Sequence, residues 1–142
     1  MPIYSHILVL IPDETDGQVL VEHAVRLAEG LGAKMTLCHV SNDLRPMDFI
    51  SDSRTGDSQS IEIIEAKEML SRVAEAVSYP IQISQLVTMQ RFKDMEKFIN
   101  ENDIDVVIAG HKNRFMGSLT SWSAEFINHL SIDVLIHHVE KS

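Results

Sequence analysis

The chain has 142 residues, of which 44% are hydrophobic and 23% charged, and its formal charge is −9. This length and composition suit one compact folded domain and exclude two separate hydrophobic cores. The acidic excess repels nucleic-acid phosphates and anionic membrane surfaces alike, so neither is expected as a partner.

The cysteine content and the apolar runs predict a cytoplasmic protein. Cys38 is the only cysteine, which excludes an intrachain disulfide, and its place in an apolar run predicts a buried thiol. The apolar run Ile7–Ile11 is too short to span a bilayer or to form the core of a signal peptide.

The first predicted element is a central strand over Ile3–Ile11, because this segment is apolar on both faces and ends at the turn pair Pro12-Asp13. A helix follows, and Thr15 with Gln18 fits a capping box at its start. Apolar residues recur at helical spacing until glycines close the segment. They are Leu20, Ala24, Leu27, Ala28 and Leu31, and the closing glycines are Gly30 and Gly32.

A second strand is expected over Met35–Val40, which is again apolar. Ser41–Ser60 is polar, contains Pro, Gly, Asp and Ser, and shows no periodicity, so it predicts a long exposed loop. The apolar spacing over Ile63–Val77 predicts a second amphipathic helix, ended by the breaker Ser78-Tyr79-Pro80.

Alternation of apolar and polar residues over Ile81–Leu86 predicts a half-exposed edge strand. Residues 92–99 carry the spacing of a third helix, for which Thr88 is the cap candidate. Asp105–Ala109 is expected to be a fourth buried strand, terminated by Gly110.

The C-terminal part predicts a fourth helix through Trp122–Leu130, beginning between Ser118 and Ser123, and a last strand over Ile132–Val139. Strands and helices therefore alternate along one domain that covers residues 1–142. This pattern requires parallel strands, right-handed crossovers and helices on both faces of an α/β sheet. Ligands of such sheets bind beyond the carboxyl ends of the strands, where the turns at Pro12, Val40 and Gly110 are expected.

Several segments resemble the universal stress protein family. They are His6-Ile7-Leu8-Val9 and Val21-Glu22-His23-Ala24-Val25 near the start, the turn that follows Gly110, and Ile132-Asp133-Val134-Leu135-Ile136 near the end. The resemblance covers the whole chain. It implies one open, Rossmann-like, five-stranded parallel sheet of order 3-2-1-4-5, a role in resistance to stress, and a homodimer formed through the last strand.

Members of that family that bind ATP carry Gly-x-x-Gly, nine further residues and then Gly-Ser or Gly-Thr. Here only Gly110 matches, because the other three positions hold Asn113, Ser123 and Ala124. Asn tolerates a left-handed backbone, but a Ser123 side chain would stand where the triphosphate must approach. As a helix cap, the same serine would satisfy free N–H groups of the helix.

The binding members also carry an Asp at the end of the first strand, a position that falls on Pro12 here, with Asp13 one residue late. Proline offers neither a carboxylate nor an N–H. These departures resemble the universal stress protein A branch of the family, whose members are not known for binding ATP, so no cofactor is predicted. The alternative is a switch or slow ATPase that binds ATP or AMP at the turn after Gly110. Its expected contacts are Asp13, Val40, Gly110, Asn113, Ser121 and Ser123.

Catalytic and metal sites are not expected. His39 and His111 approach the rim at the carboxyl ends, but no third ligand lies at a fixed spacing from either. His137 and His138 are consecutive in a strand, so they point to opposite faces and cannot chelate one ion within a chain. The chain has no Gly-x-Ser-x-Gly elbow for a nucleophile, which favours a non-enzymatic protein.

The last strand predicts a homodimer. A strand added after the final crossover should lie at a sheet edge, and an open apolar edge is an aggregation hazard that pairing with a second copy removes. Burial of the strand within one monomer is the alternative. The expected interface residues are Ile132, Val134, Leu135, Ile136, His137 and His138. Another protein partner, docked on the polar segment Ser41–Ser60, is a further alternative.

Overall fold

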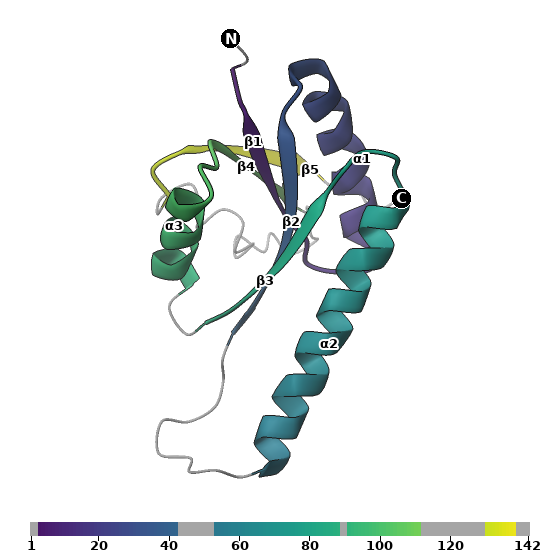
Figure 1. The fold of residues 1–142 in the computed structure, drawn as a ribbon, viewed down its shortest axis with the longest axis vertical. Helices are drawn as coiled ribbons and strands as arrows, with labels where there is room; N and C mark the ends of the chain where they lie inside the picture. The colour runs from purple at the N-terminus through teal and green to yellow at the C-terminus, as the bar shows by residue number, and fades with distance from the viewer. Residues whose placement is uncertain (1–2, 43–52, 89–90, 112–129, 139–142) are drawn as a thin grey trace, which may run out of the picture.

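Five parallel strands form one open sheet of order β3-β2-β1-β4-β5, as the resemblance implies, in a computed structural model of the chain (Figure 1). The structure describes residues 3–42, 53–88, 91–111 and 130–138. Within these residues the elements are, in chain order, β1 (His6–Leu10), α1 (Glu14–Leu31), β2 (Lys34–Asn42), α2 (Ser53–Glu75), β3 (Gln82–Thr88), α3 (Arg91–Glu101), β4 (Val106–His111) and β5 (Asp133–His138).

The helices cover both faces of the sheet. Figure 1 shows α1 and α2 on one side of the strands and α3 on the other. Right-handed crossovers explain this arrangement. The chain moves one way along the sheet from β1 to β3 and then returns past β1 to β4, so α3 must lie on the opposite face.

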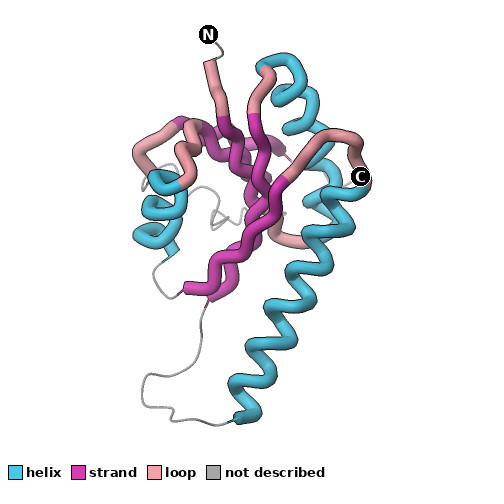
Figure 2. The backbone as a smooth tube through the Cα atoms, viewed as in Figure 1, coloured by secondary structure: helices cyan, strands magenta, loops and turns pink. Residues whose placement is uncertain are grey.

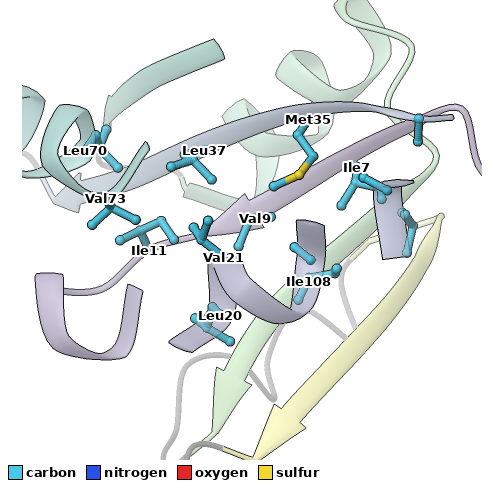
Figure 3. Packing of buried hydrophobic residues seen from close by; sticks show 14 of the residues in the cluster. Ile7, Val9, Ile11, Leu20, Val21, Met35, Leu37, Leu70, Val73 and Ile108 are labelled. Carbon is cyan, nitrogen blue, oxygen red and sulfur yellow. The ribbon is translucent and has the colours of Figure 1, made fainter. Parts of the chain in front are cut away.

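The central strand β1 is buried along its whole length because both of its faces are covered. Its residues Ile7 and Val9 pack under α1 and α2, with Leu20 and Val21 of α1 and Leu70 of α2 in the same cluster (Figure 3). A second cluster lies under α3. Its fully buried members are Leu8, Leu10, Cys38, Met95, Ile99, Ile104, Val107 and Ala109. The predicted burial of Cys38 is confirmed.

The start of α1 differs from the predicted capping box. The helix begins at Glu14, and its N-cap is Asp13, whose side chain accepts a hydrogen bond from the backbone N–H of Asp16 at 2.8 Å. Asp and Thr are both good N-caps, and the cap is the last residue with an extended backbone before the helix, which here is Asp13. The end of α1 agrees with the sequence, because Gly32 has a positive φ of 68°.

The predicted loop over Ser41–Ser60 is wrong in part. β2 continues to Asn42, and α2 already begins at Ser53. Figure 2 shows that the first turns of α2 extend past the strands, so they need no apolar period. Within α2, Ile61 and Ile64 are both 56% exposed. Residues 43–52 lie outside the described residues.

Two further boundaries differ from the predictions. Gly110 does not end the fourth strand, because β4 runs to His111 and pairs Gly110 with His137 of β5. Thr88 does not cap the third helix; it is the last residue of β3. Both residues have neighbouring strands with which to pair, which local sequence cannot reveal. The predicted fourth helix lies almost wholly in residues 112–129, outside the described residues.

A polar cluster ties the amino ends of the strands together. The carboxylate of Asp105 accepts hydrogen bonds from the backbone N–H of Ser5 at 2.8 Å, from its hydroxyl at 3.0 Å and from the backbone N–H of His6 at 3.0 Å. Burial raises the pKa of Asp105, but these hydrogen bonds outweigh it and hold the pKa below its ordinary value. The buried His6 ring donates from Nδ1 to the carbonyl of Asn102 and lies 2.8 Å from the Thr36 hydroxyl through Nε2. This cluster joins β1 to β2 and β4.

Candidate functional site

The rim at the carboxyl ends of β1, β2 and β4 is the candidate ligand site. The chain leaves β1 for β2 on one side and reaches β4 on the other side, so the strand order reverses at β1. Crevices form at this kind of switch point. The structure brings the ends of these three strands, with Asp13, Val40 and Gly110, to the same rim (Figure 1).

The backbone and side chain of Asp13 are committed to α1. Its backbone is extended, with φ −156° and ψ 178°, and its carboxylate caps Asp16. Its carbonyl also accepts the N–H of Gly17 at 2.9 Å. One of the N–H groups at the positive end of α1, an end that elsewhere attracts phosphate, is therefore already bonded within the chain.

Acidic side chains surround this helix end. Glu14 and Asp16 lie in the first turn, and Asp16 is buried. Glu14 accepts a hydrogen bond from Nε of Arg72 at 3.0 Å, a salt bridge that connects α1 with α2. Acidic residues at an N-terminus stabilise the helix through its dipole but repel a phosphate group. The local field therefore disfavours an anion at this end of α1.

Pro12, at the position where the resemblance led us to expect an acid, is exposed and has no N–H to offer. Val40 is half-buried in β2 and packs against the cluster under α3. Gly110 is half-buried within β4. Asn113, Ser121 and Ser123 lie outside the described residues, so the nucleotide contacts predicted for them remain predictions.

His39 has a definite role at this rim. Its Nδ1 lies 2.8 Å from the carbonyl oxygen of Ile11, and because a carbonyl only accepts, Nδ1 must carry the proton. The hydrogen bond fixes the ring and secures the segment between β1 and α1. In the described part of the chain, no three His, Cys, Asp or Glu side chains are grouped to hold a metal ion. The side chain of His111 lies outside the described residues.

Gln85, in the middle of β3 and beside His39, is a polar residue that sequence reasoning missed. It pairs with His39 in the parallel register of β2 and β3, and its side-chain Nε2 is buried with no hydrogen-bond partner among the described residues. A buried, unpaired amide costs about 1–3 kcal/mol. The alternation of Ile81, Ile83 and Gln85 gave a signal for the inward face, but not for the missing partner.

The last strand lies at an edge of the sheet, as predicted. Ile132, Val134 and Ile136 are half-buried on the face that α3 covers. On the other face Leu135 is 47% exposed, and the ring of His137 packs against that of His23 of α1, with centroids 3.8 Å apart and the ring planes tilted by 40°. The side chain of His138 lies outside the described residues.

Asp133, at the start of β5, is also held from within the chain. Its carboxylate accepts a hydrogen bond from the Tyr4 hydroxyl at 2.8 Å. This hydrogen bond, reinforced by burial and by the nearby carboxylates of Asp133 and Asp105, raises the pKa of Tyr4. Because side chains alternate between the two faces of a strand, Asp133 and His137 lie on the same face of β5, on either side of Leu135.

In the described residues, no helix is long and apolar enough to cross a membrane.

The chain matches the family model described as the universal stress protein family over residues 3–138. It is 30% identical over 136 residues to universal stress protein A of Yersinia pestis, covering 94% of this chain and 90% of the relative. The corresponding Escherichia coli K12 protein is also 30% identical, with 94% and 93% covered.

Solved structures share the fold. Universal stress protein UspA from Lactobacillus plantarum superposes with a TM-score of 0.73 at 18% identity, covering 94% of this chain and 97% of the other. The Archaeoglobus fulgidus protein in complex with dAMP has a TM-score of 0.66 at 20% identity, covering 94% and 98%. A universal stress protein in complex with cAMP has a TM-score of 0.65 at 17% identity, covering 95% and 97%.

Proposed function

The chain belongs to the universal stress protein family, and from that premise we propose that it is a cytoplasmic, non-enzymatic homodimer that acts in the stress response and does not bind ATP. The proposal has two separable parts. One concerns the rim at the carboxyl ends of the strands, and the other concerns the edge strand β5.

The use of Asp13 as a helix cap carries the first part of the proposal. Its Oδ1 already accepts the N–H of Asp16, which holds the carboxylate against the helix end, so a ligand that needed the carboxylate in another orientation would have to break the cap. Loss of an Asp cap costs about 0.5–2 kcal/mol of helix stability. Glu14 and Asp16 beside it would add repulsion toward a triphosphate.

A nucleotide-binding switch is the second candidate. Two proteins of the same fold are in complex with cAMP and with dAMP, so this architecture accommodates an adenine nucleotide. Gly110 is the one position of the predicted glycine pattern that this chain keeps, and it lies on the same rim. A nucleoside monophosphate such as cAMP or dAMP carries less charge than ATP and would meet less repulsion from the acidic helix end.

Equilibrium dialysis separates the two candidates. Wild-type protein and the variant Gly110→Val are dialysed against labelled ATP with Mg²⁺, cAMP and dAMP, and phosphate release is followed in parallel. Gly30→Ala is the matched control, since Gly30 is exposed on α1 and, in the part of the chain that the structure describes, an added Cβ there meets no atom within 4 Å beyond the adjoining helix backbone. The proposal expects no retention of any nucleotide at micromolar concentration and no phosphate release.

Retention by wild type and Gly30→Ala that disappears in Gly110→Val would establish the nucleotide switch and overturn the proposal. Retention by all three proteins would also overturn it and would place the nucleotide away from Gly110. Circular dichroism of each variant confirms that the sheet has formed before dialysis is interpreted. Sedimentation of wild-type protein tests the homodimer independently of any nucleotide.

A further inference from the structure

The open edge of β5 also bears on the register in which two copies of the strand would pair. In the described residues, β5 pairs only with β4, and its other edge has no strand beside it. The pairing runs in register from Val106 opposite Asp133 to His111 opposite His138. Backbone N–H and C=O groups along such an edge can pair with a second strand. This inference rests on the proposed homodimer and specifies how its two copies would meet.

Symmetry limits the ways in which two β5 strands can pair. Two identical strands related by a two-fold axis must run antiparallel, and directly opposite residues then project to the same face. The axis must therefore pass beside one residue, which faces its own copy. Each choice of that residue fixes every other contact along the strand, because side chains alternate between the faces.

The geometry points to a two-fold axis at Leu135, so that Leu135 faces the partner's Leu135 and Asp133 faces the partner's His137. By symmetry, His137 faces the partner's Asp133. On the other face, Val134 meets the partner's Ile136. This register pairs apolar with apolar residues on both faces and places an acid opposite a base at each end.

The other registers place Leu135 opposite a polar side chain or set two identical polar side chains against each other. An axis at Val134 puts Leu135 opposite the partner's Asp133, and an axis at Ile136 puts Leu135 opposite the partner's His137. Either choice would bury a leucine that is 47% exposed in the monomer against a polar group. An axis at His137 would set two imidazole rings against each other.

Contacts within the monomer already orient the two polar groups. The ring of His23 packs against that of His137, with centroids 3.8 Å apart, and holds it on the face of α1. Tyr4 donates to Oδ2 of Asp133, and a carboxylate has further lone pairs for a second donor. The ring of the partner's His137 would supply that donor from across the edge.

Single cysteine variants report the register directly. Opposite residues in antiparallel strands have Cα atoms about 4.5–5.5 Å apart, within the range of a disulfide, whereas diagonal neighbours are about 7–8 Å apart. Leu135→Cys is therefore expected to form a disulfide dimer on mild oxidation, while Val134→Cys and Ile136→Cys remain monomeric on non-reducing gels. Wild type is the control, because its Cys38 is buried.

Charge exchange provides a second test that needs no disulfide. Asp133→Lys and His137→Glu are each expected to raise the dimer Kd roughly two- to thirtyfold, since each removes two cross-strand pairs. The double variant should recover most of the affinity, because each Lys would again face a Glu of the partner. Glu75→Lys is the matched control; it reverses an exposed charge at the end of α2, which contacts β2 and β3, and should leave Kd within about twofold.

The outcomes distinguish the register from the dimer itself. If Val134→Cys or Ile136→Cys crosslinks in place of Leu135→Cys, or if the double variant shows no recovery, the register is wrong and the homodimer stands. If wild-type protein sediments as a monomer at all concentrations tested, the proposed homodimer fails together with the register. Crosslinking at Leu135 together with recovery in the double variant would support both.

Discussion

Gly17, in the first turns of α1, offers a sharp test of the packing that places α1 against the sheet. An ideal Cβ at this position would lie 2.7 Å from Cγ2 of Ile11 and 3.4 Å from Cγ2 of Val73. Both neighbours are buried, at 2% and 0% exposure. The Ile11 side chain is branched at Cβ, so its Cγ2 methyl group cannot move away without rotation of the whole side chain about χ1. Gly17→Ala therefore introduces a real overlap.

Two opposing effects set the size of the change. Alanine is favoured over glycine in a helix by about 0.8–1.0 kcal/mol. Overpacking a close-packed core costs about 1–3 kcal/mol. We expect Gly17→Ala to lower the free energy of unfolding by about 1 kcal/mol, which for a chain of this length lowers Tm by about 3 °C.

Gly30→Ala is the matched variant on the same helix. Among the described residues, no atom outside the adjoining helix backbone lies within 4 Å of an added Cβ at Gly30, so only the gain in helix propensity remains, and stability should rise by about 0.5–1 kcal/mol. Because the propensity gain is common to both variants, their difference isolates the steric cost. Urea unfolding followed by circular dichroism, at one fixed protein concentration, measures it. Equal stabilisation by both substitutions would refute the close approach of α1 to Ile11 and Val73.

Three other side chains give further tests. Asp105→Asn should lose about 1–3 kcal/mol near neutral pH, because it weakens the charge-assisted hydrogen bonds from Ser5 and His6. The pKa of Asp105 is lowered in the fold, so its stabilisation is present above its ordinary pKa and disappears as pH falls below about 4. The urea midpoint of wild type should fall more steeply in this acidic range than that of the variant, and equal slopes would contradict the assignment. Tyr79→Phe should cost about 1–2 kcal/mol in urea unfolding, because the hydroxyl donates to carbonyl groups at the end of α1, and an unchanged midpoint would argue against that bond. Burial raises the pKa of the Cys38 thiol to about 12, so alkylation at pH about 8 should be slow until urea unfolds the protein, and fast labelling of the native protein would disprove its burial.

The helix boundaries show which local signals decide a structure and which do not. Thr15 and Gln18 satisfy the capping-box pattern, yet Asp13 caps α1. The hydrogen bond from the N–H of Ile11 to Cys38 at 2.8 Å fixes where the chain leaves the sheet, and the helix begins soon afterwards. That bond joins residues far apart in sequence, so no local pattern could reveal it.

The candidate sites divide in the same way. The sequence indicated that Gly110 is the one position of the expected glycine pattern that is kept and that Pro12 stands at the expected acid position, where residue identity alone excludes a carboxylate. It did not show that Asp13 is engaged as a cap or that His39 bonds to Ile11. Hydrogen-bond partners depend on where separate segments meet.

The sequence by itself determined the alternation of strands and helices, and with it the parallel sheet, because continuous apolar runs such as β1 are stable only when both faces are covered. It also predicted that the last strand lies at an edge, which the strand order confirms. The tertiary structure alone decided which polar groups meet, and it set Tyr4 against Asp133 and His23 against His137 on the face of the exposed Leu135. Periodicity records only whether a residue faces the core or the solvent, whereas a polar contact requires two distant segments to meet at a particular distance and angle.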